Sequence, residues 1–287
     1  MNPKYPFYIV SKLRADSRLT VKAFDKMNIS YRVVIDEDDY DSYAAVMDKN
    51  KIIIMPKRYY DEYDTCDNIG DNKAKGPGAA RNFVWDDSIK RGFKRHWVFD
   101  DNVRSFMWAN NNLMVCATDG TIFKAMEDFV DRYTNVAIAG PNYAMFAPRR
   151  SKHQPFTLNT RIYSMLLIKN DIPYRWRGRY NEDTDLSLRV LKDGWCTIQF
   201  NAFLGAKIST QVLKGGNSDN FYFNEGTYNK SKMQKDLHPD VSTIVYKFNR
   251  VHHVVDYTPF KKNKLIRDPN VVVTGGINNY GMEIRNK

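Results

Sequence analysis

The fold is decided by the stretch His96-Trp97-Val98-Phe99-Asp100-Asp101-Asn102, in which an apolar run leads directly into two carboxylates. The apolar run predicts a buried strand, and carboxylates at its end are costly unless a cation or a hydrogen-bond donor neutralises them. Mg²⁺ and Mn²⁺ bind one or two carboxylates together with substrate phosphate oxygens, so the pair suits a nucleotide diphosphate. A pair of loop or capping aspartates is the alternative, and spacing alone does not separate the two.

Strands and helices alternate around this stretch. Apolar runs predict strands at 5–10, 31–35, 51–56, 97–99 and 136–140, and helices are predicted at 17–27, from Gly76-Pro77-Gly78 to about 94, and at 121–133. This alternation indicates the α/β class, with parallel strands joined by right-handed crossovers. The polar loop 11–16, the acidic run 36–39 and Asp100-Asp101 follow strand ends, so they should converge on one crevice. After residue 145 the pattern loosens into a strand at 161–168, a helix at 182–192 and shorter elements.

The composition excludes several classes of protein. An aromatic content of 14% is too high for a disordered chain. The longest apolar runs, such as 52–55, are far shorter than the roughly 18 residues of a membrane-spanning helix. The three cysteines lie far apart without a CxxC pair, which disfavours a disulfide scaffold and favours a reducing compartment.

The positive charge lies in one half of the chain. Residues 1–144 hold 21 basic and 21 acidic residues, whereas residues 145–287 hold 23 basic and 12 acidic ones, which accounts for the whole net charge of +11. A basic half favours nucleic-acid binding, because neutralising phosphates releases condensed counterions. A solvated basic surface that aids solubility is the other interpretation.

A second acidic cluster, Glu182-Asp183-Thr184-Asp185, precedes an apolar helix. Acids in a first helical turn stabilise the helix, so capping explains Asp183 and Asp185. A carboxylate at a helix start also suits a base that takes a proton from an acceptor hydroxyl. Both roles are compatible with the same segment.

Two further stretches carry candidate ligands. The turn at Gly76-Pro77-Gly78, followed by Arg81 and Asn82, could place backbone N–H groups and a guanidinium beside a diphosphate. It matches neither a Walker loop nor a dinucleotide-binding turn, which argues against a kinase and a dehydrogenase. His252-His253 lies in a strand-like run, so one imidazole should face each side of it.

Aromatic and basic residues interleave in the segment 174–180. Arginines bind phosphates, and an exposed tryptophan or tyrosine can stack on an unstacked base. The alternative is a turn whose long side chains cover the sheet. The candidates for DNA binding are Arg175, Trp176, Arg177, Arg179 and Lys214.

Together these stretches resemble the TET-associated glycosyltransferases of tailed phages, and the base J glucosyltransferases look like relatives. The matching residues are Tyr8-Ile9-Val10-Ser11-Lys12 with Arg14, Arg81-Asn82, the 96–102 stretch, Glu182-Asp183, Gly215-Gly216-Asn217, and His252-His253 with Val255-Asp256-Tyr257. The segment with Trp97 and Asp100-Asp101-Asn102 is the most specific of them. The chain departs from the family at Leu13, where we expect a glycine.

The resemblance implies a GT-A-type, Rossmann-like nucleotide-sugar domain with a mixed central sheet. One such domain would span 1–287, with 1–144 binding the nucleotide sugar and 145–287 forming a basic acceptor-binding half. The resemblance implies that Asp101 and one of His252 and His253 bind the metal, and that Asp100 contacts the ribose or the donor sugar. It implies a nucleotide pocket formed by Ser11, Arg14 and Glu37, with Arg81 and Asn82 also binding the donor. Catalysis would be by Asp183, with Glu182 as its neighbour.

We therefore expect a metal-dependent enzyme, using Mn²⁺ or Mg²⁺, that moves a sugar from a UDP-sugar to a hydroxymethylated cytosine or uracil in double-stranded DNA. The resemblance further implies a cytoplasmic monomer that contacts no membrane, in the host cytoplasm if a phage encodes it. Two alternatives stand beside it: a glycosyltransferase acting on a protein or polysaccharide, and a DNA-binding protein without catalysis.

Overall fold

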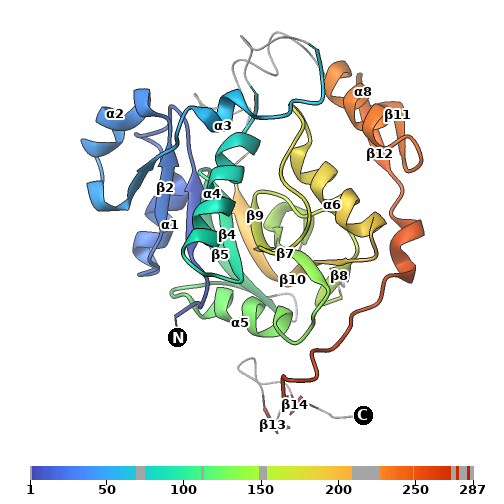
Figure 1. Cartoon of the computed structure of the whole chain (residues 1–287). Helices are drawn as coiled ribbons and strands as arrows, with labels where there is room; N and C mark the ends of the chain where they lie inside the picture. The colour runs from blue at the N-terminus through green and yellow to red at the C-terminus, as the bar shows by residue number, and fades with distance from the viewer. Residues whose placement is uncertain are drawn as a thin grey trace.

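A computed structural model describes residues 2–68, 75–110, 113–148, 154–208, 227–247, 249–272, 276–277 and 283–284. Its centre is a ten-stranded sheet in the order β3-β2-β1-β4-β9-β7-β10-β5-β6, with β8 paired to β10 (Figure 1). The strands are β1 (Phe7–Val10), β2 (Arg32–Ile35), β3 (Ile52–Ile54), β4 (Arg95–Asp100), β5 (Val103–Asn110), β6 (Leu113–Cys116), β7 (Val136–Tyr143), β8 (Phe156–Leu158), β9 (Met165–Lys169) and β10 (Cys196–Lys207).

The direction of the strands changes across the sheet. β3, β2, β1 and β4 run parallel, as the alternation of strands and helices predicts. Beyond β4 the sheet is mixed, because β9 runs antiparallel to both β4 and β7 whereas β10 pairs in parallel with β7. The α/β class with a mixed central sheet is therefore confirmed, and the all-parallel expectation holds only for the first four strands.

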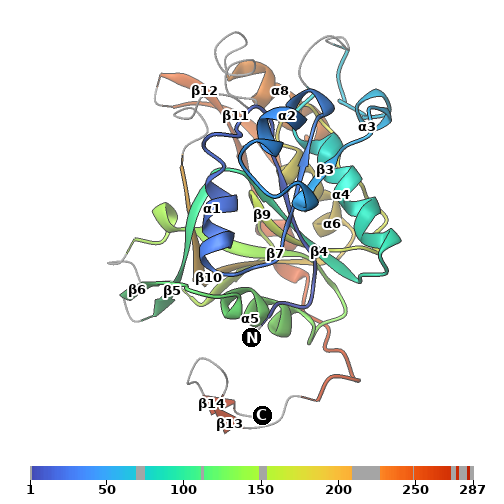
Figure 2. The same ribbon diagram turned by 90° about the vertical axis from the view of Figure 1, so that its left-hand side faces the viewer.

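Helices cover both faces of the sheet. Alternate residues of β1 divide between two cores: Phe7 and Ile9 pack with α1 (Leu19–Lys26) and α5 (Thr121–Val130), whereas Tyr8 and Val10 pack with α4 (Gly78–Lys90) and α6 (Glu182–Lys192). This division follows from the two-residue period of a strand. Figure 2 shows α1 on one side of the strands and α4 and α6 on the other.

An aromatic cluster fixes the position of β4. The rings of Phe7 and Phe99 stack with centroids 5.5 Å apart, and Trp97 stacks on Phe99 at the same distance. The indole N–H of Trp97 donates to the buried carboxylate of Glu127 at 2.9 Å. β4 is therefore held rigidly where it ends at Asp100.

The sequence pattern missed several elements. The strand predicted as buried at 51–56 is the short edge strand β3, and its Ile54 is 40% exposed. α8 (Tyr228–Leu237) and the hairpin of β11 (Ser242–Lys247) and β12 (Arg250–Val255) lie beside α6 (Figure 1). The remaining elements are α2 (Tyr40–Ala44), α3 (Arg58–Asp61), the 3₁₀ turns Glu37–Asp39, Lys49–Lys51, Ala144–Phe146 and Thr258–Lys262, and the strand pair β13 (Gly276–Ile277) and β14 (Glu283–Ile284).

None of the helices in the described part of the chain has the length and apolar character needed to span a membrane.

Candidate active site at the carboxyl ends of the strands

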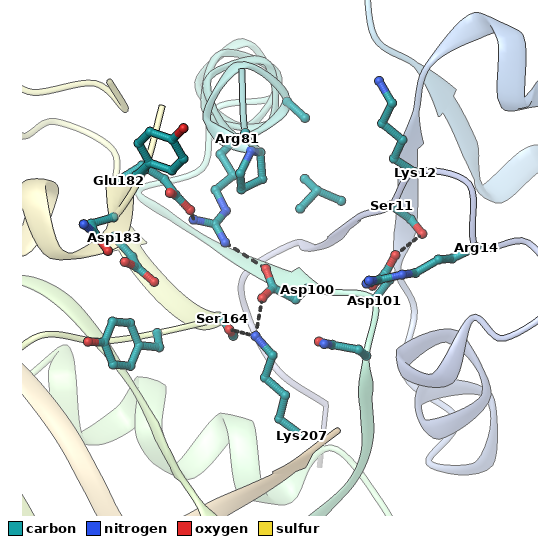
Figure 3. A pocket seen from close by; sticks show the side chains of 18 of the residues that line it. Ser11, Lys12, Arg14, Arg81, Asp100, Asp101, Ser164, Glu182, Asp183 and Lys207 are labelled. Carbon is teal, nitrogen blue, oxygen red and sulfur yellow. Dashed lines mark hydrogen bonds and ion pairs between the residues drawn. The ribbon is translucent and has the colours of Figure 1, made fainter. Parts of the chain in front are cut away.

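A cavity of about 550 Å³ opens where β1, β2 and β4 end. Ser11 follows β1, Asp36 follows β2, and Asp100 and Asp101 lie at the end of β4, and all four residues line the cavity. The start of α6 lines the cavity with Glu182, and Figure 3 shows Glu182, Ser11, Asp100 and Asp101 around one space. The predicted convergence on one crevice is confirmed, and the volume is in the range of small-molecule sites.

Asp100 lies at the centre of the cavity between two cations (Figure 3). Its Oδ1 accepts from Arg81 Nη2 at 2.8 Å, and its Oδ2 accepts from Lys207 Nζ at 2.8 Å. Lys207 Nζ also donates to Ser164 Oγ at 2.5 Å. Burial opposes ionisation of Asp100, but Lys207 and Arg81 outweigh it and hold the pKa of this carboxyl well below its usual range. Asp100 is therefore a fixed negative charge.

Arg81 links this centre to the start of α6. Its Nη1 donates to Glu182 Oε1 at 2.9 Å, and its guanidinium lies 4.7 Å from the ring centroid of Trp176. The start of α4 lies directly against the ring of Tyr63. A side chain on Gly78 would collide with this ring, because its Cβ would be 1.9 Å from Tyr63 Oη. A glycine at this position therefore lets α4 deliver Arg81 into the cavity.

Asp101 occupies the side of the cavity next to β1. Its Oδ1 accepts from Arg14 Nη1 at 2.6 Å and its Oδ2 from Ser11 Oγ at 2.6 Å, while Tyr43 Oη lies 2.5 Å from Ser11 Oγ. The side chains of Arg14 and Asp101 are each only 6% exposed. Burial raises the pKa of Asp101 despite the opposing effect of Arg14.

The loop after β1 has the backbone shape that a glycine favours. Leu13 has φ +54°, in the left-handed region where side chains other than glycine are strained. Its N–H donates to Asp39 Oδ2 at 2.8 Å, and its side chain is 63% exposed. The chain therefore keeps at Leu13 the conformation of the glycine expected there.

Two predicted donor-binding residues do not line the cavity. Glu37 is exposed on the 3₁₀ turn after β2, and Asp36 lines the cavity in its place. Asn82 points away from the cavity, since its side-chain amide accepts from Trp176 N and donates to Trp176 O, both at 2.9 Å. The structure therefore does not bring Glu37 or Asn82 to the cavity, because one is exposed to solvent and the other anchors a loop.

Asp183 and Glu182 face the cavity together from the first turn of α6 (Figure 3). Asp183 Oδ1 accepts from Thr184 N at 2.8 Å. Burial raises the pKa of Asp183, and Arg81 and Lys230 oppose the rise. Burial also raises the pKa of Glu182, and the neighbouring Asp183 raises it further against the effect of Arg81. A carboxylate with a raised pKa beside an open space can accept a proton from a bound hydroxyl.

Both acids lie in the first turn of α6, as the capping interpretation requires, but no side-chain cap precedes them. The residue before α6 is Asn181, which has left-handed φ of 54° and makes no side-chain capping bond. Asp185 by contrast is structural, since it is buried and accepts from Arg177, Arg189 and His238.

The predicted metal ligands do not form a metal site. Both oxygens of Asp101 are taken by Arg14 and Ser11, and both oxygens of Asp100 are taken by cations. His252 Nε2 accepts from Arg250 Nε at 3.1 Å. Within the described ranges, no three His, Cys, Asp or Glu side chains lie together in a way that could hold a metal ion. Each of these carboxylate oxygens already faces a cation or a hydroxyl, and a divalent ion would have to share them, so the donor set is a poor fit for Mn²⁺ or Mg²⁺.

The two histidines differ in position. Both lie on β12, and of the two it is His253 that lines the cavity. Burial, together with Lys230 and Arg161, lowers the pKa of His253 to about 4, so its imidazole is neutral at physiological pH.

The aromatic-basic segment 174–180 packs mostly inward. Trp176 is 2% exposed beneath Arg81, so it cannot stack on a base. Arg179 is buried and makes a bidentate pair with Asp67, and Arg177 pairs with Asp185. The prediction of base stacking by Trp176 is wrong, because the turn covers the core, which is the alternative interpretation of this segment. Arg175 is exposed, and Lys214 and Gly215-Gly216-Asn217 lie outside the described residues.

Several lining residues escaped the sequence analysis, among them Lys207, Ser164 and Arg161. Lys207 and Ser164 contact each other at Asp100, and Arg161 stacks on Tyr163 with 4.9 Å between its guanidinium carbon and the ring centroid. They come from the end of β10 and the loop before β9, and no motif surrounds them. Only the fold brings them to the cavity.

Comparison with known proteins identifies the family. The model of the TET-Associated Glycosyltransferase family matches residues 5–216, which confirms the predicted resemblance. A search of curated proteins finds no match. Among solved structures, the crystal structure of mannose-1-phosphate geranyltransferase from Thermus thermophilus is similar with 8% identity and a TM-score of 0.31, covering 71% of this chain and 57% of that chain. The chain thus spans less than two thirds of that structure.

The buried Arg14–Asp101 pair gives a test of the role of Asp101. Asp101→Ala leaves Arg14 buried without a counter-charge, and we expect the free energy of unfolding to fall by about 3–5 kcal/mol. Urea unfolding in EDTA measures this loss without any metal. Asp38→Ala, at an exposed carboxylate, is the control and should change stability by less than about 0.5 kcal/mol. A stable Asp101→Ala protein would show that Arg14 does not depend on this carboxylate.

Proposed function

We propose that this chain, which belongs to the TET-associated glycosyltransferase family, moves a sugar from a UDP-sugar to the hydroxymethyl oxygen of a modified cytosine or uracil in DNA. The observation that carries the proposal is the arrangement of the cavity, in which the cations Arg81 and Lys207 lie near the half-buried carboxylate of Asp183, whose pKa is raised. The cations can stabilise a diphosphate, and the carboxylate can take the proton of an attacking hydroxyl.

The donor would lie across the strand ends. The nucleoside would occupy the side lined by Ser11, Arg14 and Asp36, close to β1 and β2. The diphosphate would lie at the centre, where Arg81 and Lys207 supply N–H donors to phosphate oxygens. With the donor bound in this way, its sugar would lie between Asp100 and Asp183.

The acceptor would enter over the 3₁₀ turn after β7. Met145 and Phe146 line the cavity and are 57% and 55% exposed, and Tyr143 packs against Phe146 with ring centroids 5.6 Å apart. Apolar and aromatic side chains at a cavity mouth suit a base that has left the stack. Arg161 and Lys230 line the same cavity and would contact phosphates of the DNA strand.

The chemical step follows from these positions. The acceptor oxygen forms a bond to the anomeric carbon while the bond from that carbon to the diphosphate oxygen breaks. Asp183 takes the hydroxyl proton, and UDP leaves with the electron pair. Glu182 stays paired with Arg81, so Asp183 is the carboxylate that receives the proton.

A panel experiment tests the function. The protein is incubated with UDP-sugars and with duplexes containing hydroxymethylcytosine, hydroxymethyluracil or unmodified bases, and the digested nucleosides are weighed by mass spectrometry. We expect a hexosyl or pentosyl mass increase on one hydroxymethylated base and none on unmodified DNA. Transfer to a protein or polysaccharide instead, with all duplexes unchanged, would overturn the DNA acceptor.

Asp183→Asn tests the base. We expect kcat to fall by about 10²–10⁴-fold, because an amide does not accept the hydroxyl proton, while UDP binding stays nearly unchanged. Glu37→Gln, at the exposed carboxylate that the structure places outside the cavity, is the matched control and should keep full activity. If Asp183→Asn transfers sugar at the unmodified rate, another group takes the proton.

The raised pKa of Asp183 also predicts a pH profile. The base must be ionised, so kcat/KM should rise with pH through a pKa above the ordinary aspartate value of about 3.9. Glu182→Gln removes a neighbouring negative charge and leaves Arg81 free to act on Asp183, so the acid limb should move to lower pH. An acid limb that stays in place in Glu182→Gln would show that it reports a different group.

A further inference from the structure

We propose that the Lys207 ammonium, together with Arg81, stabilises the departing diphosphate in place of a divalent metal ion. This inference rests on the proposed function, since it concerns the leaving group of that reaction. It assigns a catalytic role to a lysine at the end of β10, to which sequence analysis gave no role.

The carboxylates at the end of β4 already face cations. A divalent ion bound to them would lie next to Lys207 and Arg81, each 2.8 Å from Asp100, or next to Arg14, 2.6 Å from Asp101. The side chain of Arg81 is 2% exposed and that of Lys207 is 13% exposed, so neither has a solvated alternative close by. A metal ion would place two further positive charges beside these buried cations, which is costly.

The lining of the cavity is positively charged before any metal binds. Its described lining includes seven cationic side chains and five carboxylates. The cations are Lys12, Arg14, Arg81, Arg161, Arg179, Lys207 and Lys230, and the carboxylates are Asp36, Asp100, Asp101, Glu182 and Asp183. Arg179 is paired with Asp67 outside the lining, so the other six cations exceed the five carboxylates by one. This excess already favours a diphosphate, and a divalent ion would add two more positive charges.

The ammonium group of Lys207 can bind a phosphate while it keeps its present contacts. An ammonium has three N–H donors, and its contacts to Asp100 and Ser164 use two of them. The third can donate to a phosphate oxygen without breaking either contact. Asp100, the neighbouring Tyr143 and Asp183 raise the pKa of Lys207 against the effect of burial, so the group stays charged.

The role in the reaction is electrostatic. When the bond from the anomeric carbon to the diphosphate breaks, UDP gains one negative charge on the oxygen that leaves. Lys207 and Arg81 neutralise this charge as ion pairs, and no proton moves from them. The proton of the acceptor still goes to Asp183.

The test is calorimetric binding of UDP to the full chain, dialysed against EDTA and then measured in EDTA and in Mn²⁺. We expect equal Kd in both, to within about threefold, and a loss of about tenfold or more in Lys207→Ala under both conditions. Lys207→Arg should restore most of the binding, since it keeps the charge. Lys90→Ala, an exposed lysine at the end of α4, is the control and should bind as the unmodified chain does.

Single-turnover transfer to hydroxymethylated DNA in EDTA completes the test. We expect the same rate in EDTA and Mn²⁺, and in Lys207→Ala a loss of rate at saturating donor, which a merely structural lysine would not cause in a protein of unchanged circular dichroism. If Lys207→Ala does not fold, the comparison of EDTA with Mn²⁺ in the unmodified chain and in Lys207→Arg decides. If sugar transfer or UDP binding needs Mn²⁺, this inference alone is overturned. If the protein neither binds UDP nor transfers sugar, in EDTA or in Mn²⁺, the proposed function is overturned as well.

Discussion

The placement of Asp100 between Arg81 and Lys207 is the interaction on which the site depends. It joins the end of β4 to α4 on one side and to β10 on the other, and Arg81 continues the contact to α6 through Glu182. Four elements from distant parts of the sequence are thus tied to one carboxylate. A buried charge this close to two cations is stable only while both remain in place, so the same contacts that hold the elements together also fix the electrostatics of the cavity.

The sequence predicts the parts of the fold in which local pattern and environment agree. β1, β2 and β4 are short apolar runs that end in polar residues, and their carboxyl ends meet as the parallel arrangement requires. The sequence pattern did not predict β10, because the polar residue Asn201 interrupts the apolar pattern of this strand. Asn201 is nevertheless only 8% exposed. Its amide is satisfied by Asn142 and Gln154, contacts that no local pattern reveals.

The same limit applies to the site. Carboxylates after strands were found from the sequence, because a charge at the end of an apolar run is unusual by itself. The direction of Trp176 could not be found in this way, since interleaved aromatic and basic residues are equally compatible with an exposed surface and with arginines stacked on buried rings. Lys207 is a single lysine near the end of a strand, and its significance comes only from the position of Asp100.

The two acids at the start of α6 show how a crowded, charged cavity can still hold carboxylates of raised pKa. Burial raises the pKa of both acids, and a nearby carboxylate adds to the effect, Asp183 for Glu182 and Asp100 for Asp183. Arg81 is bonded to Glu182 and not to Asp183, so a direct ion pair holds the first acid in position. Asp183 is influenced by Arg81 and Lys230 through space, and its carboxylate accepts a hydrogen bond from the backbone N–H of Thr184. Because Glu182 is tied to Arg81 and Asp183 is not, Asp183 combines a raised pKa with a carboxylate that faces the cavity.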